Sequence, residues 1–149
     1  MIQTAQGIEN MTLDIKKEMH VNAPIAVTFE SLLEQIGPNN ERDQGDPMPM
    51  VLEAWPGGRW YRDLGNDNGH LWGHVQAIKR PTLLEICGPL FASYPFLSNV
   101  QYRLTEKDGG TLITFRHSAI GLIEDQHREG VSKGWTMILD RVRKRAEAK

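Results

Sequence analysis

The chain has 149 residues, of which 40% are hydrophobic and 24% are charged, as expected for one soluble globular domain with its own core. Its net charge of −2 argues against a general nucleic-acid binder. Cys87 is the only cysteine, so no internal disulfide can form, and no apolar run approaches the ~20 residues of a membrane span. The segment from Met1 to Asn10 lacks the features of a signal peptide, so we expect a cytoplasmic protein without a membrane partner.

The beginning of the chain predicts a tail, a strand and a helix. Residues 1–11 are polar and unpatterned and predict a loose tail, which leaves 12–149 as a single domain. Apolar and polar residues alternate over 13–21, which is typical of a half-buried strand. Pro24 suits the first turn of a helix, and the apolar stripe of this helix ends at Ile36.

The middle of the chain predicts a polar loop and then six strands separated mainly by short turns. Asn66-Asp67-Asn68-Gly69 is the strongest hairpin signal among these turns. The six expected strands cover 50–54, 59–64, 71–78, 83–87, 100–105 and 112–118.

The segment 88–99 is unusual because it has the prolines and serines of a loop and yet carries several large apolar side chains. An apolar loop must cover something. Two interpretations remain open: the loop closes the mouth of a cavity, or it forms the contact of a homodimer. Its large apolar residues are Leu90, Phe91, Tyr94, Phe96 and Leu97.

The last stretch, 124–149, predicts a long amphipathic helix that covers the sheet. Its apolar stripe includes Trp135 and Leu139 at helical spacing. Gly130 and Gly134 each cost about 1 kcal/mol relative to alanine within a helix. This cost suggests close approach to a strand or room for a ligand, unless the helix begins only after Gly130.

The predicted order is therefore strand, helix, six strands and a long helix, which indicates an α+β fold with an antiparallel sheet. One sheet face should carry the helix and the other should meet water. A strongly bent sheet around a helix leaves a space, which is either filled by side chains or open as a pocket.

Several short motifs, taken together in this order, resemble one known family. Pro56-Gly57-Gly58-Arg59-Trp60 is followed by Gly73-His74-Val75, by Pro81 before a returning strand, and by Gly110-Thr111 before Ile113, Phe115 and His117. Gly134-Trp135 and Leu139 then follow in the last helix. The combination resembles the Hsp90-ATPase-activator-homologue-like branch of the START/Bet v 1-like superfamily, also called SRPBCC, over nearly the whole chain.

The resemblance implies a helix-grip fold, in which a curved antiparallel sheet of about seven strands wraps around the C-terminal helix and encloses a cavity. Members of the superfamily bind lipids, sterols, polyketides and other apolar molecules, and some are cyclases, aromatases or dehydratases. The resemblance to this branch implies no particular catalytic residues, because the branch has no shared catalytic set. A co-chaperone-like role with Hsp90 is not expected, because such an activator would carry a further domain before this one and only about ten residues precede the first strand.

The leading hypothesis is a domain that binds a small apolar molecule under the last helix. Inward-facing aromatic side chains also suit a filled core, so two interpretations of these residues stay open: the lining of a ligand pocket, or a core filled by side chains. The candidate ligand-binding residues are Trp60, Arg62, Phe91, Phe96, Tyr102, Phe115, His117, Trp135 and Leu139.

His117 is the weak catalytic candidate of an alternative hypothesis, a polyketide cyclase-like or dehydratase-like enzyme that also uses Arg62 or Tyr102. A histidine beside the cavity could act as an acid or base near neutral pH. The structural alternative is a buried neutral histidine bonded to a carbonyl or a hydroxyl.

Three further features complete the expectations. If Trp60 points inward, Arg62 does too and needs a partner, either Glu53 or the carboxylate of a ligand. His70 and His74 are expected about 13 Å apart on a strand, too far to share a metal. We expect the core face of this strand to carry the alternate residues 71, 73 and 75. No phosphate loop, nucleophile elbow, Cys-x-x-Cys pair or dinucleotide fingerprint is present, so we expect neither a metal nor a cofactor.

Overall fold

A computed structural model describes residues 7–149 and contains the predicted order of strand, helix, six strands and long helix. A short 3-10 helix, η1, precedes the first strand within the expected tail, whose residues 1–6 lie outside the described part. The elements are η1 (Ile8–Met11), β1 (Thr12–Val21), α1 (Ile25–Ile36), β2 (Val51–Leu52), β3 (Arg59–Gly65), β4 (Asn68–Lys79), β5 (Leu83–Gly88), β6 (Phe96–Lys107), β7 (Gly110–Gly121) and α2 (Asp125–Glu147).

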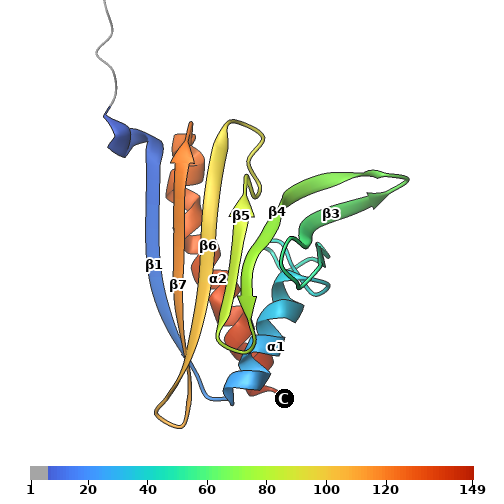
Figure 1. The fold of residues 1–149 in the computed structure, drawn as a ribbon, viewed down its shortest axis with the longest axis vertical. Helices are drawn as coiled ribbons and strands as arrows, with labels where there is room; N and C mark the ends of the chain where they lie inside the picture. The colour runs from blue at the N-terminus through green and yellow to red at the C-terminus, as the bar shows by residue number, and fades with distance from the viewer. Residues whose placement is uncertain (1–6) are drawn as a thin grey trace, which may run out of the picture.

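The seven strands form one antiparallel sheet in the order β1-β7-β6-β5-β4-β3-β2. Figure 1 shows α2 running along one face of this sheet, with α1 crossing near the C-terminal end of α2. Within residues 7–149 no helix covers the other face of the sheet. The expected α+β helix-grip fold is confirmed, and it places the apolar stripe of α2 against the inner face of the sheet.

The β3–β4 hairpin extends away from the rest of the sheet (Figure 1). Asn66 and Asp67 both have positive φ at its tip, as a two-residue turn between twisted strands requires. Nearer the body of the protein the ladder is irregular. Trp60 pairs with Gly73 and Tyr61 pairs with Leu71, so Trp72 has no partner on β3 and forms a bulge.

Several strand boundaries differ from the sequence-based expectation, and the start of β6 differs most. β6 begins at Phe96 rather than near residue 100, because residues 96–99 continue the ladder with β7 and β5. α2 begins at Asp125, before Gly130, so the interpretation of a helix that starts after Gly130 is wrong.

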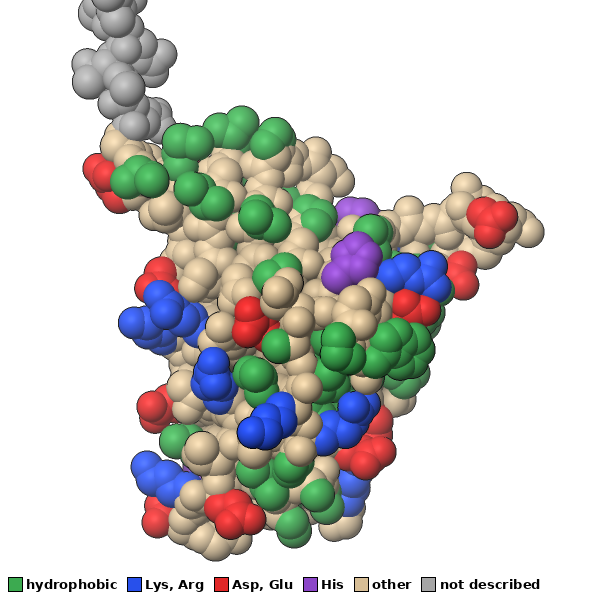
Figure 2. All heavy atoms as spheres, in the orientation of Figure 1, with side chains coloured by type: hydrophobic (Ala, Val, Ile, Leu, Met, Phe, Trp, Pro, Cys, Tyr) green, Lys and Arg blue, Asp and Glu red, His purple; other side chains and the backbone are tan. Residues whose placement is uncertain are grey.

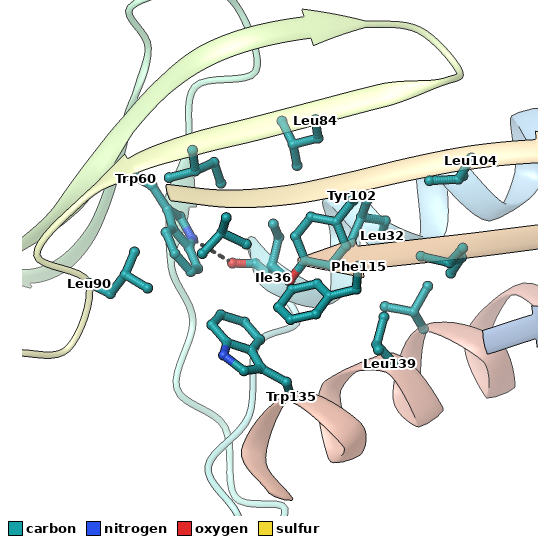
Figure 3. Packing of buried hydrophobic residues seen from close by; sticks show 14 of the residues in the cluster. Leu32, Ile36, Trp60, Leu84, Leu90, Tyr102, Leu104, Phe115, Trp135 and Leu139 are labelled. Carbon is teal, nitrogen blue, oxygen red and sulfur yellow. Dashed lines mark hydrogen bonds between the residues drawn. The ribbon is translucent and has the colours of Figure 1, made fainter. Parts of the chain in front are cut away.

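The core lies between the inner sheet face and the two helices (Figure 3). Tyr102 on β6 and Phe115 on β7 face each other across the ladder, with their rings 5.1 Å apart. Phe115 also packs at 4.8 Å on Trp135 of α2. This aromatic layer fills the middle of the space between sheet and helix.

The opposite face of the sheet is polar over most of its area, with scattered charges (Figure 2). Apolar side chains gather near η1 and the adjoining ends of β6 and β7 in this view. The large exposed apolar residues of these segments and of the loop after β7 are Ile8, Leu97, Ile120 and Leu122. No helix within the described residues is both long enough and apolar enough to cross a membrane.

Candidate functional site

A hollow of about 520 Å³ lies at the end of α2 that is nearer its N-terminus. One wall is the inner side of β3 and β4 with the loop after β5, a second wall is α2, and the third is the loop over residues 37–50, which we call the 37–50 loop. The lining residues are Ile36, Asn40, Glu41, Arg42, Asp43, Gln44, Met48, Trp60, Trp72, Phe91, Gln126, His127, Gly130, Val131, Gly134, Trp135 and Ile138.

Three tryptophans line the hollow, and each places its indole N–H in a protein hydrogen bond. Trp60 donates to the carbonyl of Ile36 at 2.8 Å, and Trp72 donates to Nδ1 of His70 at 3.1 Å. Trp135 donates to Nδ1 of His117 at 2.9 Å. Figure 3 shows Trp60 and Trp135 directed toward the same region from the sheet and from α2. The tryptophans therefore offer apolar ring surface to the hollow rather than polar groups.

Two glycines one helical turn apart form part of the helix wall. A Cβ added at Gly130 or at Gly134 would have no heavy atom within 4 Å outside its own helix backbone and neighbours. Of the two explanations offered for these glycines, close approach to a strand is therefore wrong. The space beside them is open, and it belongs to the hollow.

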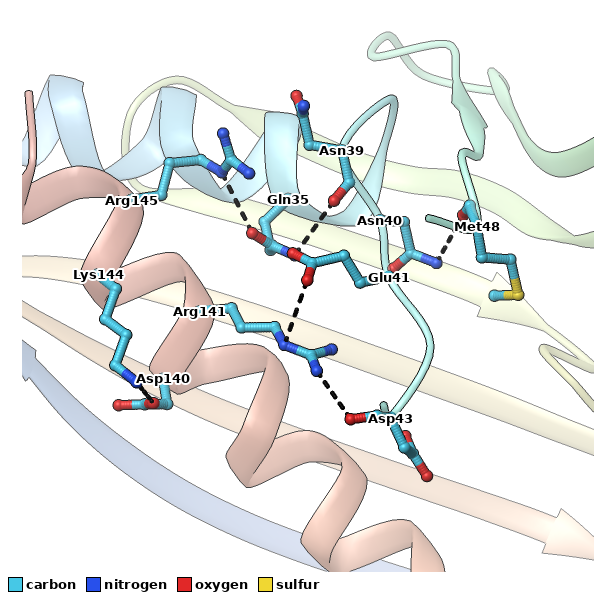
Figure 4. A network of polar contacts seen from close by, with 10 residues as sticks. All are labelled: Gln35, Asn39, Asn40, Glu41, Asp43, Met48, Asp140, Arg141, Lys144 and Arg145. Carbon is cyan, nitrogen blue, oxygen red and sulfur yellow. Dashed lines mark hydrogen bonds and ion pairs between the residues drawn. The ribbon is translucent and has the colours of Figure 1, made fainter. Parts of the chain in front are cut away.

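The 37–50 loop is tied to α2 by polar contacts (Figure 4). Arg141 donates to the carbonyl of Asp43 at 3.1 Å, and its Nε lies 3.9 Å from the Glu41 carboxylate. Gln35 of α1 donates to the same carboxylate at 3.1 Å and accepts from Arg145 at 3.1 Å. These contacts between α1, the loop and α2 hold the third wall in position.

The charges around the hollow are largely compensated. Arg42 pairs with Asp46 at 3.3 Å, and Glu41 lies beside Arg141. The lining thus contains one paired arginine, two acidic residues and an apolar interior. This arrangement suits a neutral molecule better than an anion.

His127 in the first turn of α2 also lines the hollow. Its Nδ1 lies 2.7 Å from the hydroxyl of Tyr94. The two rings stack at 22° with centroids 5.6 Å apart, and the edge of Phe91 packs on the imidazole at 5.3 Å. The ring of His127 is therefore held from two sides.

His117 is completely buried, and both of its ring nitrogens are used. Nδ1 accepts from Trp135, so Nε2 carries the proton and donates to the Ser98 hydroxyl at 2.8 Å. Burial lowers the pKa of His117 to about 4, which keeps the ring neutral. A buried neutral histidine bonded to a hydroxyl was the structural alternative stated above, and the contacts match it.

The expected ligand-binding residues divide into two groups. Trp60, Phe91 and Trp135 line the hollow. The others, apart from Arg62, lie in the buried core instead: Phe96, Tyr102, Phe115, His117 and Leu139. The hydroxyl of Tyr102 has no hydrogen-bond partner within residues 7–149, and burial raises its pKa.

Arg62 lies on the inner side by register, opposite His70, but it is half-exposed on the extended hairpin. Its expected partner Glu53 instead forms a bidentate pair with Arg59 at 2.7 and 2.8 Å. The predicted Arg62–Glu53 pair is therefore wrong. Arg59 at the root of the hairpin holds Glu53 instead.

The prediction of which β4 residues face the core is wrong at one position. Leu71 was placed with Gly73 and Val75, yet Leu71 is 44% exposed and Trp72 packs inward at 5.1 Å from Trp60. The bulge at Trp72 shifts the alternation by one residue. Among the described residues no group of three potential metal ligands occurs.

The apolar loop after β5 mostly turns inward. Leu90 and Phe96 are buried, and Phe91 lines the hollow. Leu97, now in β6, is 60% exposed. The homodimer stays a prediction, but most of the loop's apolar surface is already covered by the core.

Sequence reasoning missed Trp72, His127 and the 37–50 loop as parts of the site. His127 had a usable signal, because residues 127, 131, 135 and 138 follow helical spacing and share one face. The bulge that turns Trp72 inward has no comparable signal. The loop reaches the site through contacts with Arg141, which sequence spacing does not reveal.

Comparison with known proteins places the chain in a family. The model of the family described as Activator of Hsp90 ATPase homolog 1-like protein matches residues 45–147. The comparison with curated proteins gives no match.

Solved structures share the fold at low identity. An uncharacterised Rhizobium leguminosarum protein is 17% identical, with a TM-score of 0.70 and coverage of 93% of this chain and 96% of that one. Ara h 8.0201 is 14% identical, with a TM-score of 0.68 over 93% and 99%. The di-domain ARO/CYC StfQ is 12% identical, with a TM-score of 0.64 over 95% of this chain and 51% of that one. The family match and the shared architecture agree, and the chain belongs to the Activator of Hsp90 ATPase homolog 1-like family with a Bet v 1-like helix-grip fold.

Proposed function

We propose that the protein binds a small, neutral, largely apolar molecule in the hollow between β3, β4, the 37–50 loop and α2. The observation that carries this proposal is the open space beside Gly130 and Gly134. Each glycine costs the helix about 1 kcal/mol. Among the described residues, no strand approaches closely enough to require either glycine. The two glycines were explained either by close approach to a strand or by room for a ligand, and only the second explanation remains.

The chemistry of the walls supports an aromatic or otherwise flat ligand. Trp60, Trp72, Phe91 and Trp135 present ring surface, and all three indole N–H groups are already bonded to protein. A volume of about 520 Å³ lies within the range typical of small-molecule sites. StfQ, named as an ARO/CYC of the steffimycin biosynthetic pathway, shows that this fold occurs in small-molecule biosynthesis.

Enzymatic use of His117 is disfavoured by its contacts. Both nitrogens are bonded, the ring is buried, and His117 does not line the hollow. A cyclase-like reaction would therefore need other residues. The expectation that the protein does not act as an Hsp90 co-chaperone stays a prediction.

The proposal can be tested by NMR with tetralin, a small bicyclic hydrocarbon with one aromatic ring. We expect tetralin to shift the indole N–H signals of Trp60, Trp72 and Trp135, whereas the signal of Trp55, which is 58% exposed and outside the hollow, stays in place. Gly134→Leu would fill the space and weaken binding by about ten-fold or more.

Thr136→Leu provides the matched control, because it adds an apolar side chain to an exposed position of the same helix. It should leave tetralin binding unchanged. The proposal is wrong if tetralin shifts none of the three signals, or if Gly134→Leu and Thr136→Leu affect binding equally.

A further inference from the structure

The polar groups that line the hollow differ in whether the protein already satisfies them. Asn40 donates to the carbonyl of Met48, and Glu41 and Arg42 have charged partners. His127 bonds through Nδ1 only, to Tyr94. Its Nε2 has no hydrogen-bond partner within residues 7–149, although the side chain is half-buried and lines the hollow.

The partner on Nδ1 determines which kind of group Nε2 presents. Burial raises the pKa of Tyr94, so its phenol keeps its proton. With Tyr94 as the donor in the 2.7 Å contact, its hydroxyl hydrogen is directed to Nδ1 of His127. In this tautomer Nε2 carries the imidazole proton and acts as a hydrogen-bond donor.

The orientation of this donor is fixed by packing. The imidazole lies between the stacked ring of Tyr94 and the edge of Phe91. Phe91 packs in turn on Trp72 at 6.3 Å and 75°, and Trp72 packs on Trp60. The donor is thus part of the same rigid aromatic wall that forms the apolar surface of the hollow.

We infer that the Tyr94–His127 pair anchors the ligand, and that the ligand is a neutral aromatic molecule with a hydrogen-bond-accepting oxygen such as an aryl ketone. This inference rests on the proposed function, which it narrows to one class of molecule. His127 Nε2–H donates to the carbonyl oxygen, and the ring system of the ligand lies against the tryptophans. An anionic ligand is disfavoured because Glu41 and Asp43 are at the rim and Arg42 is paired with Asp46.

The test compares tetralin with 1-tetralone, which has nearly the same shape and one added carbonyl. The measured quantity is the ratio of the two dissociation constants, obtained by NMR titration of the wild type and of His127→Phe. Phenylalanine keeps an aromatic ring between Tyr94 and Phe91 but removes the donor. We expect the substitution to raise the dissociation constant of 1-tetralone about five-fold and that of tetralin by less than about two-fold. This difference corresponds to the loss of one neutral hydrogen bond.

Two further variants and one spectrum sharpen the result. His74→Phe makes the same chemical change at an exposed position outside the hollow and should alter neither affinity. Tyr94→Phe removes only the hydroxyl and should reduce the preference for 1-tetralone. Long-range ¹H–¹⁵N spectra of the free protein should show His127 protonated on Nε2.

The outcomes separate this inference from the proposed function. If His127→Phe weakens the binding of both ligands equally, or leaves the binding of 1-tetralone unchanged, the assignment of the Tyr94–His127 anchor is wrong. The proposal of binding in the hollow would still stand. Protonation of His127 on Nδ1 alone would also overturn it. If neither molecule binds the wild type, the proposed function fails and the anchor fails with it.

Discussion

The indole N–H of Trp135 on α2 donates a 2.9 Å hydrogen bond to Nδ1 of His117 on β7, and the two rings meet edge-to-face at 81°. This contact joins the last helix to the centre of the sheet. It also fixes the tautomer of His117 and directs the indole N–H away from the hollow. One hydrogen bond therefore contributes both to the stability of the core and to the apolar character of the site.

Stability should decrease in mild acid because His117 is kept neutral. Its pKa is lowered to about 4 by burial, whereas an unfolded histidine titrates near 6.5. Below pH 6.5 the unfolded chain takes up a proton that the folded chain does not, so the free energy of unfolding falls by up to about 1.4 kcal/mol per pH unit until about pH 4. Urea unfolding at a series of pH values measures this slope.

His117→Gln is the comparison for this slope, because it removes the titrating group. Asp14 and Glu53, whose pKa values are lowered by hydrogen bonds from Arg116 and Arg59, have ordinary values of 3.8 and 4.5 and lose their contribution only at lower pH. Between pH 6.5 and 4.5 the variant should therefore show a shallower slope. Equal slopes would mean that His117 is not the group responsible.

Trp135→Phe should destabilise the protein by about 2 to 4 kcal/mol. The change leaves Nδ1 of buried His117 without its donor and removes ring atoms that pack on Phe115. Urea unfolding at pH 7 measures the loss. Thr136→Ala, at the next and exposed position, should stay within about 0.5 kcal/mol of the wild type, and a similar loss at both positions would contradict the assigned contact.

Gly134→Ala should raise the free energy of unfolding by about 0.5 to 1 kcal/mol. The new Cβ meets no atom within 4 Å, and alanine favours a helix. Gly73→Ala is the opposite case, because its Cβ would lie 2.6 Å from the carbonyl oxygen of Cys87 and should destabilise the sheet. Thermal or urea unfolding of both variants gives the two signs, and a destabilised Gly134→Ala would show that the space is not open.

Arg141→Ala should loosen the 37–50 loop more than it destabilises the whole fold. The substitution removes the hydrogen bond to the Asp43 carbonyl and the partner of Glu41. We expect amide hydrogen exchange at Gly45 to rise about five-fold or more, with a loss of global stability near 1 kcal/mol. Lys144→Ala, which removes an exposed pair with Asp140, should leave the exchange of the loop unchanged.

The fold could be predicted because its signals are local. Period-two alternation over β1 and helical spacing from Val131 to Leu139 each indicate one type of element. Asn66-Asp67 marks a hairpin because its residues tolerate the positive φ values that the turn requires. Short turns between consecutive strands then leave an antiparallel sheet as the consistent arrangement.

The site could be predicted only in part because its residues meet through long-range packing. Phe115 and Trp60 both face inward, but Phe115 lies mid-sheet, where α2 fills the space, and Trp60 lies where the hollow begins. The alternation of polar and apolar residues predicts which face of a strand a side chain occupies. It does not predict whether α2 covers that side chain or leaves it beside the hollow. Trp72 was placed outside because one bulge reverses the alternation that the prediction used.

The most direct test of the central claim is to locate bound tetralin by intermolecular NOEs in the isotope-labelled protein. Our account predicts NOEs from tetralin to the indole protons of Trp60, Trp72 and Trp135 and to the Hα protons of Gly130 and Gly134. NOEs confined to the exposed apolar residues Leu97, Ile120 and Leu122 would instead place the molecule on the outer surface and contradict binding in the hollow.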